Sequence, residues 1–539
     1  MTPGPASYTG AGAPTARGSY GPWLITAVVA LATFMEVLDI TIVGVALPNI
    51  AGNLGATVEE STWVLTGYLV ANAIMLPLSG WLATALGRKR FYMACLAAFT
   101  VSSLACGMSE SLGALVLFRV LQGLSGAGMV PIAQAILADS FPPEKRGQGF
   151  SVFSLVIVTG PALGPPLGGW LTDVLSWHWV FLINLPAGIL ALVLTGLLVQ
   201  DPHWVRRARR RWLVSGQYVD IPGILLTASG LGCLVLFLEE GQRHDWFAST
   251  YITTAAVVSA VSLVALAIRE WNHHSPMVEV RLFRDRGFIA GNILFFTFGA
   301  IAVSSAQLVP QFAQELLGYT ATDAGLAMMM GALVTIVLMP AVGQLTTKIQ
   351  PKYMVAFGLL VEAWAYFMLY GGFNADLSFY QLTLTRMGQL AGFPFIIVPL
   401  LTAAFIKLPP EKNSQASALL NMSRAVGGSA GVALLQAELH RRSQLHQGRL
   451  VADLSPYNDV FQRTVDHLQA TWASLGAGPD LATTRAFGVV YQLAQGQARM
   501  LAYIDVFTLT AGIALVAFPL AFVLHRMPRK GDSGGAAAH

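Results

Sequence analysis

The chain consists largely of apolar runs of about 20 residues, separated by short polar or charged clusters. A helix of ~20 residues crosses the hydrocarbon core of a bilayer. Of the 539 residues, 55% are hydrophobic and only 11% are charged, whereas an ordinary soluble domain is about 25% charged. The sequence therefore predicts an all-α polytopic membrane protein rather than a soluble one.

Fourteen runs of this kind predict fourteen membrane spans. They lie near residues 23–48, 62–84, 90–108, 112–137, 148–170, 178–200, 219–239, 248–269, 288–312, 323–347, 353–371, 379–406, 413–438 and 501–525. Lys and Arg gather in short cytoplasmic loops. Here alternate connections are rich in both, while the opposite short connections hold only Arg243. This asymmetry predicts an even number of spans with both termini in the cytoplasm.

Three stretches are too polar or too short of apolar residues to span. Residues 1–22, rich in Gly, Pro, Ala and Ser, predict a disordered N-terminal tail, and residues 527–539 predict a C-terminal tail. Residues 440–500 form a long outer connection, in which VFQRTVDHL and RAFGVVYQL could each make an amphipathic helix lying on the membrane or the protein. Two interpretations of this connection stay open: a solvated loop, and a docking surface for a partner protein.

Two carboxylates, Glu36 and Asp39, lie inside the apolar run FMEVLDITIVGVALP. A carboxylate at the membrane centre costs at least ~2.5 kcal/mol, so such a residue is a functional candidate. Three residues apart, the two acids share a helical face and can line one cavity. Their interaction would let at least one of them bind and release a proton. The alternative is a structural salt bridge, most simply from Asp39 to Arg119.

Further charged residues within predicted spans include Glu362, Arg386 and Arg424. Glu362 and Arg424 both lie near the middle of their spans. They are candidates for substrate contact, and the alternative is a structural Glu–Arg pair across the second half of the chain.

Three local motifs are rich in small residues, and the first two of them also carry charge. GWLATALGRKR places Gly80 and Gly87 at the ends of a tight turn before Arg88. FRVLQGLSGAG places Gln122 and Gly123 after Arg119. In TGPALGPPLGGW, small residues permit close helix packing and prolines bend the helix. The glycines and prolines of this motif are Gly160, Pro161, Gly164, Pro165, Pro166, Gly168 and Gly169.

In this order, LDITIVGVALP, GWLATALGRKR, FRVLQGLSGAG and TGPALGPPLGG resemble four motifs of the major facilitator superfamily. These are the first-helix acidic motif, the helix 2–3 loop motif, the helix-4 Arg motif and the helix-5 antiporter motif. The fourteen spans resemble its drug/proton antiporter branch. SWHWVFLINLPAGI, LVPQFAQELLGYTATDAG and the long outer connection look like multidrug exporters of the EmrB type. Two positions depart from the family pattern: Thr84 stands where Asp is usual, and Gly44 where Asn is common.

The resemblance implies two six-helix bundles, residues 23–200 and 288–526, with two further helices inserted in the linker 201–287. It implies a proton-driven antiporter of the bacterial inner membrane that exports hydrophobic or amphipathic toxic compounds by alternating access. It also implies a periplasmic adaptor protein and an outer-membrane channel as partners. Asp39 belongs to the acidic motif, which makes it the first candidate for proton coupling, with Glu36 and Arg119.

Other functions remain as alternatives. A proton-coupled uptake symporter uses the same scaffold, and a membrane sensor or membrane enzyme is a third class. The chain contains no GxxxxGK[ST], HExxH or GxSxG motif, so the sequence predicts neither ATP-driven transport nor an enzyme. No metal, cofactor or nucleic acid is expected.

Aromatic and amide side chains on the first and ninth spans are candidate substrate contacts, because broad apolar sites with few polar anchors suit hydrophobic compounds. Packing is the simpler explanation for aromatic residues at helical spacing. The candidates are Phe34, Phe295, Phe296, Gln307 and Gln311.

Overall fold

The computed structural model describes residues 21–214, 220–273, 276–372, 377–406, 408–455 and 457–525. Within these ranges every regular element is a helix. The predicted tails 1–22 and 527–539 lie outside the described residues, apart from positions 21 and 22.

The long helices follow the predicted spans closely. The first group comprises α1 Pro22–Asn53, α2 Val58–Ser61, α3 Trp63–Leu86, α4 Arg88–Gly107, α5 Leu112–Gly126, α6 Met129–Ser140, α7 Arg146–Val174, α8 Trp179–Leu182 and α9 Asn184–Leu198. The middle group comprises α10 His203–Val214, α11 Ile221–Glu240 and α12 Thr250–Asn272. The last group comprises α13 Arg286–Glu315, α14 Ala321–Leu345, α15 Pro351–Gly372, α16 Phe379–Ala404, α17 Asn413–Asp453, α18 Asp459–Ser474 and α19 Pro479–Ala517.

Short 3-10 helices join several of these elements. They are η1 Pro143–Lys145, η2 Trp246–Ala248, η3 Val280–Arg284, η4 Pro410–Lys412 and η5 Phe518–Val523.

The prediction of about fourteen membrane spans is confirmed. In the described part of the chain, thirteen helical segments are long and apolar enough to cross a membrane. The remaining predicted span is α15, which carries Lys352 and Glu362 and packs against α16 and α19. Three spans in the described part of the chain consist of two consecutive α-helices: α2 with α3, α5 with α6, and α8 with α9.

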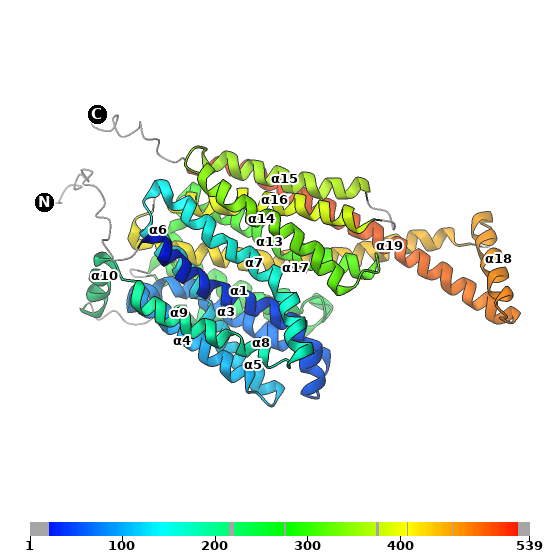
Figure 1. The fold of residues 1–539 in the computed structure, drawn as a ribbon, viewed down its shortest axis with the longest axis horizontal. Helices are drawn as coiled ribbons and strands as arrows, with labels where there is room; N and C mark the ends of the chain where they lie inside the picture. Colours follow the sequence, from blue (N-terminus) through cyan, green and yellow to red (C-terminus); the bar gives the residue numbers. More distant parts are fainter. Residues whose placement is uncertain are drawn as a thin grey trace.

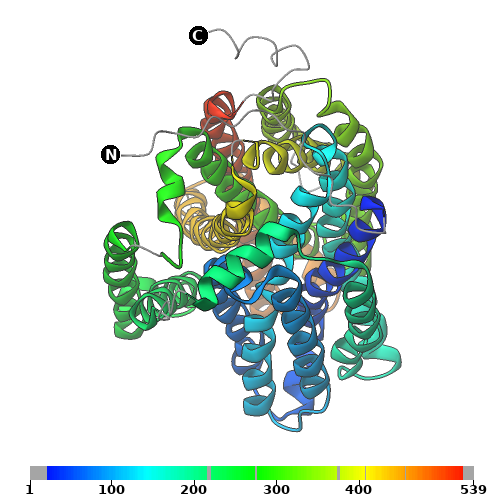
Figure 2. The same ribbon diagram turned by 90° about the vertical axis from the view of Figure 1, so that its left-hand side faces the viewer.

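The helices pack in two groups (Figure 1 and Figure 2). In the first, α1 packs against α6, α7 and α9, and α5 packs against α3 and α4. In the second, α13 packs against α17, and α16 packs against α14 and α15. The two groups meet chiefly where α7 contacts α14 and α16, and where α17 contacts α3 and α6. This arrangement leaves the interior of each group free of lipid, so that polar side chains can be held there by one another.

The two additional helices, α11 and α12, pack side by side, and α11 also contacts α3 and α17. At the C-terminal end of α11, Glu240 accepts a hydrogen bond from Thr66 of α3 at 3.0 Å. Its neighbour Glu239 accepts one from Ser429 of α17 at 2.6 Å. One inserted helix is therefore hydrogen-bonded to both groups of helices.

Residues 440–500 form a helical arm, so the interpretation of this connection as a solvated loop is wrong. Helix α17 continues beyond the bundle to Asp453, α18 lies across the tip, and α19 returns from Pro479 (Figure 1). VFQRTVDHL lies in α18 and RAFGVVYQL lies in α19, and the two helices pack together through Val465, Ala486 and Val490.

Polar contacts explain why the arm is helical although it is too polar to span. Within α17, Arg442 donates to Glu438 one turn earlier at 2.6 Å, a spacing that stabilises helices. His446 Nε2 lies 2.8 Å from Oδ2 of Asp505 on α19, and Gln447 Nε2 donates a hydrogen bond to the hydroxyl of Tyr491 at 3.3 Å. The spanning parts of α17 and α19 thus continue outward as an antiparallel pair.

At the opposite end, which carries the α3–α4 turn, η1 and η4 (the basic end), the two groups are in close contact. Arg88 of α4 forms an ion pair with Asp139 of α6 and donates to the carbonyl of Pro410 at 2.9 Å. Asn413 of α17 donates to the same Asp139 at 2.9 Å. Deeper in the bundle, Gln134 of α6 accepts hydrogen bonds from Ser417 and Asn421 of α17, both at 2.6 Å.

Gly80 contributes to this closure in a way that differs from the sequence prediction. It lies inside α3, not at one end of the turn, while Gly87 occupies the turn with a φ of 93°. A Cβ on Gly80 would lie 2.6 Å from the Cα of Gln415. The absence of a side chain at Gly80 therefore permits the backbones of α3 and α17 to come into contact where the two helices cross. This helix crossing, and not the turn, requires a glycine at position 80.

We expect Gly80→Ala to open the basic end. Overpacking costs about 1–3 kcal/mol, and the obstructing atoms are backbone, which cannot rotate away. Spin labels at Glu144 and Glu411, exposed residues of η1 and η4, would report a shift to longer distances in pulsed electron paramagnetic resonance. Gly44→Ala is the matched control, since a Cβ there meets nothing within 4 Å. An unchanged distance distribution for Gly80→Ala would contradict the role given to this crossing.

Candidate functional site

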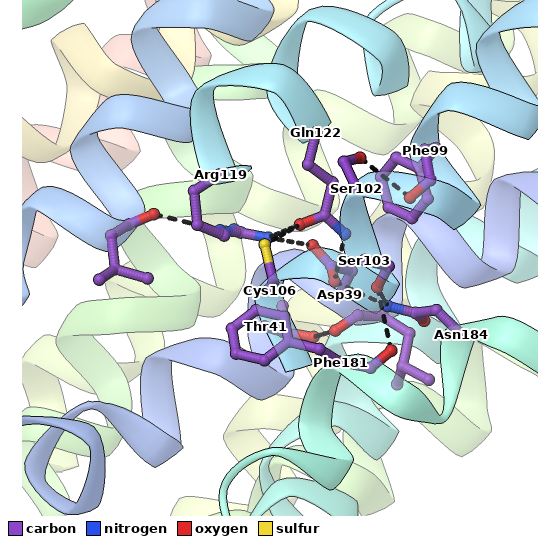
Figure 3. Close-up of polar contacts among 12 residues, drawn as sticks. Asp39, Thr41, Phe99, Ser102, Ser103, Cys106, Arg119, Gln122, Phe181 and Asn184 are labelled. Atoms are coloured by element: carbon purple, nitrogen blue, oxygen red, sulfur yellow. Dashed lines mark hydrogen bonds and ion pairs between the residues drawn. The ribbon is translucent and has the colours of Figure 1, made fainter. Parts of the chain in front are cut away.

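The carboxylate of Asp39 is the centre of a buried polar network in the first group of helices (Figure 3). Arg119 Nη1 of α5 donates to Asp39 Oδ2 at 2.5 Å. Gln122 Nε2 donates to the other oxygen, Oδ1, at 3.0 Å, and Asn184 Nδ2 of α9 donates to it at 2.8 Å. We call Asp39, Arg119, Gln122, Asn184 and Ser103 the charge network.

Both ions of this pair are removed from solvent, with 0% of either side chain exposed. A buried ion pair is tolerated only where further hydrogen bonds satisfy its remaining donors and acceptors. Arg119 Nη1 also donates to Gln122 Oε1 at 2.7 Å, and Arg119 Nε donates to the carbonyl of Val64 at 3.2 Å. The guanidinium lies 4.3 Å from the ring centroid of Tyr68, a cation–π contact.

The local sequence of α5 accounts for this geometry. Arg119 and Gln122 are three residues apart and therefore project from one face of the helix. A Cβ on Gly123 would overlap the carbonyl of Tyr68, so the glycine permits α5 to approach α3 closely. The helix-4 motif thus combines one charged and one amide side chain with a close helix crossing.

Sequence reasoning missed Asn184 and Ser103. Asn184 donates to Ser103 Oγ at 3.1 Å as well as to Asp39, and Ser103 donates to the carbonyl of Phe181 at 2.9 Å. Asn184 lies in the quoted stretch SWHWVFLINLPAGI, where it is a polar residue within an apolar run. That pattern is the available signal, and it resembles the signal that identified the acids.

Glu36 lies on the same helix as Asp39 but faces different groups. It is 5% exposed, and its Oε2 accepts no hydrogen bond from any described residue. Asn72 of α3 and the backbone of Val130 lie beside it, and it interacts electrostatically with Arg424 of α17. The two acids do interact with each other. However, Asp39 is held inside the first group of helices, whereas Glu36 faces across to the second.

The predicted pair between Glu362 and Arg424 is not formed. Glu362 of α15 interacts with Arg386 of α16, while Arg424 interacts with Glu36. The reason is the helix arrangement: α15 lies on the far side of α16 and α19, and α17 faces α3 and α6. Mid-span depth alone did not reveal which helices are neighbours.

The antiporter-like motif brings α7 against α1. A Cβ on Gly160 would lie 2.7 Å from Val37, and one on Gly168 would lie 2.9 Å from Ile42. Gly164 faces Thr41 in the same way. Gly169 does not take part, because a Cβ there would meet nothing within 4 Å. Pro161, Pro165 and Pro166 lie within the same continuous helix.

The candidate substrate contacts differ in exposure. Phe295 is buried in the core at 1% exposure, whereas its neighbour Phe296 is 38% exposed. Phe34 is half-buried on α1, and Gln307 is exposed on α13. Gln311 is bonded to Glu315 at 3.0 Å and to Gln436 of α17 at 2.8 Å.

Residues 29–432 match the family model described as Major Facilitator Superfamily. The chain is 37% identical over 439 residues to "Multidrug export protein EmrB" of Haemophilus influenzae, covering 81% of this chain and 84% of the relative. It is 33% identical to "Multidrug export protein EmrB" of Escherichia coli strain K12, covering 96% and 98%.

Solved structures share the fold. The human organic anion transporter MFSD10 superposes with a TM-score of 0.59 at 16% identity, covering 93% of this chain and 99% of that one. The proton:xylose symporter XylE superposes with a TM-score of 0.58 at 16% identity, covering 79% and 90%.

We expect Asn184→Leu to destabilise the fold by about 1–3 kcal/mol, because it removes one donor from a buried carboxylate that keeps its charge. Thermal unfolding of the detergent-solubilised protein measures the loss. Asn53→Leu is the control: this exposed amide donates only to the carbonyl of Asn49 at the end of α1. Equal unfolding temperatures for both variants would show that Asn184 does not hold the charge network.

Proposed function

The chain belongs to the major facilitator superfamily, and from this premise we propose that it is a multidrug efflux transporter of the bacterial inner membrane. Its substrates would be hydrophobic or amphipathic small molecules, exported in exchange for protons. The observation that carries the proposal is the pair of buried acids on α1, one inside the charge network and one facing the second group of helices.

Glu36 and Asp39 are the proposed proton carriers. Arg119 is the cation that stabilises the ionised form of Asp39. A carboxylate hydrogen-bonded to a guanidinium is stable without a proton, and it needs one when the cation moves away. Glu36 faces Arg424 across the two groups of helices, so motion between them changes its electrostatic surroundings. One protonation event can thereby be linked to one conformational state.

The contacts at the basic end support alternating access. Arg88, Asp139 and Asn413 join the two groups there, and Gly80 permits α3 and α17 to cross. We propose that this is the state closed on the cytoplasmic side, with residues 23–200 and 288–526 as the two moving units. Residues 201–287, with the two inserted helices, would connect them. The basic clusters support an orientation with both termini in the cytoplasm.

The energetics suit this mechanism. One proton crossing a potential of ~100 mV releases ~2.3 kcal/mol. At about 1.4 kcal/mol per decade, that supports roughly a 50-fold gradient of a neutral substrate.

The helical arm is the proposed contact for a periplasmic adaptor protein, which would lead to an outer-membrane channel. The arm projects beyond the bundle at the end opposite the basic clusters (Figure 1). It also exposes apolar side chains, among them Tyr457 at 96%, Val460 at 73% and Leu475 at 71%. Exposed apolar residues on a projecting element mark a contact surface for another protein.

Asp39→Asn tests the coupling. We expect the variant in proteoliposomes to bind ethidium, a lipophilic cation, but to lose its transport driven by a proton gradient, because the amide cannot gain and lose the charge. Asp173→Asn, at an exposed position at the end of α7, should transport like the wild type. Full transport by Asp39→Asn would leave Asp39 with a structural role and assign the proton to Glu36.

A shortened arm tests the partner surface. Gln447 and Tyr491 are in hydrogen-bond contact, so residues 448–490 can be replaced by a short Gly/Ser bridge without straining α17 or α19. We expect unchanged transport in proteoliposomes and lost drug resistance in cells at equal expression. Unchanged resistance would exclude the arm as the contact with the envelope partners.

A further inference from the structure

Glu362 is a buried acid with no hydrogen-bonding partner. Its side chain is 0% exposed, and neither carboxylate oxygen accepts a hydrogen bond from any described residue. It lies midway along α15, which packs between α16 and α19, and its Cγ is close to Gly392 of α16. Nothing in the transport cycle described above uses this residue.

The neighbouring cation is engaged elsewhere. Arg386 of α16, 4% exposed, donates through Nη1 to Ser305 Oγ of α13 at 3.1 Å and to Gln389 Oε1 at 3.0 Å. Its Nε donates to no described residue. Arg386 and Glu362 interact electrostatically without forming an ion pair. The cluster therefore contains an unused donor on the cation and two unused acceptors on the acid.

The other titratable groups near Glu362 lie on α15 and α19. Tyr366, one turn further along α15 and 1% exposed, interacts with both Glu362 and Arg386. Helix α19 presents Phe507 and Tyr503 to this side of the bundle, and Tyr503 interacts with Glu315 and Arg499 instead. The six residues of η5, FPLAFV, include no titratable side chain.

The arrangement around Arg386 repeats that around Arg119. In both groups of helices an Arg donates through Nη1 to a Gln three residues later, at 2.7 Å from Arg119 to Gln122 and at 3.0 Å from Arg386 to Gln389. The next contact differs. Arg119 is paired with the carboxylate of Asp39, whereas Arg386 reaches only the hydroxyl of Ser305. In the second group, the acid is present nearby but unpaired.

An ionised carboxylate without a partner is strongly disfavoured in a protein interior, and more so within a bilayer. In the arrangement described, Glu362 is therefore a neutral carboxylic acid. Pairing with Arg386 would instead stabilise the carboxylate, as Asp39 is stabilised by Arg119.

We propose that Glu362 is a second proton-binding site, in the C-terminal group of helices, which releases its proton when Arg386 turns from Ser305 and Gln389 to pair with it. The proton is the ligand: Glu362 changes from acid to carboxylate, the proton passes to water, and Arg386 keeps its charge throughout. This inference rests on the proposed antiport, to which it adds a proton carried outside α1.

Infrared difference spectroscopy tests the site without transport. In the purified full-length protein, a carbonyl-stretch band of a protonated carboxylic acid should disappear as the pH is raised. Glu362→Gln should lack this band, while Asp39→Asn and the exposed-site control Glu411→Gln should keep it. Glu362→Asp keeps the carboxyl group and should shift the band to a different frequency. This variant replaces Glu362→Gln in the experiment if the Gln variant does not fold.

Transport gives the second measurement. Each coupled proton multiplies the accumulation of substrate about tenfold per unit of pH difference. With ethidium in proteoliposomes, Glu362→Gln should therefore still transport, with its accumulation reduced about tenfold per imposed pH unit.

A band that does not change with pH, or one that persists in Glu362→Gln, would overturn the proposal, as would unchanged coupling in that variant. If the wild type moves no ethidium at all, the proposed export of lipophilic cations fails, yet the infrared titration still decides whether Glu362 exchanges a proton.

Discussion

Much of the first group of helices is arranged around the buried ion pair between Arg119 and Asp39, although Arg119 Nη2 donates to no described residue. Four helices supply its partners: α1 the acid, α5 the guanidinium and Gln122, α9 Asn184, and α3 the Val64 carbonyl and the Tyr68 ring. Removing one member of a buried pair costs about 3–5 kcal/mol, because the other charge is left without a partner. The network therefore fixes the relative positions of these helices in this state, and changing the charge of Asp39 is a direct way to release them.

Small residues play the same structural part in both groups of helices. Glycines of α7 face α1, and in the second group a Cβ on Gly431 would lie 2.6 Å from the Cα of Ala300 on α13. Gly299 of α13 packs in turn against the backbone of Arg424 on α17. Without a hydrophobic drive between helices in lipid, close packing of this kind is what holds them together. The two groups thus resemble each other in packing and in the Arg–Gln motif, and differ in where the acid lies.

The spans, their number and the acidic residues of interest were predictable, because apolar length and buried charge are properties of the local sequence. The contacts between residues on different helices were not predictable from the sequence. The pairing of Glu362 with Arg424 was wrong because depth in the membrane does not determine which helices are adjacent. Gly80 belongs to a contact with Gln415, more than three hundred positions away in the chain, which no local turn motif reveals. Residues 440–500 were too polar to be recognised as continuations of spanning helices, since their stability comes from pairing with each other.

The continuity of α17 has a mechanical consequence. The same 41-residue helix begins at the closed contact with Asp139 and ends at the tip of the arm, a length of about 60 Å at 1.5 Å per residue. A stiff rod of that length that tilts by about 10° about its inner end moves its far end by on the order of 10 Å. The arm is therefore a lever as well as a surface: whatever binds its tip experiences the opening and closing of the basic end as a displacement, and resists it in return.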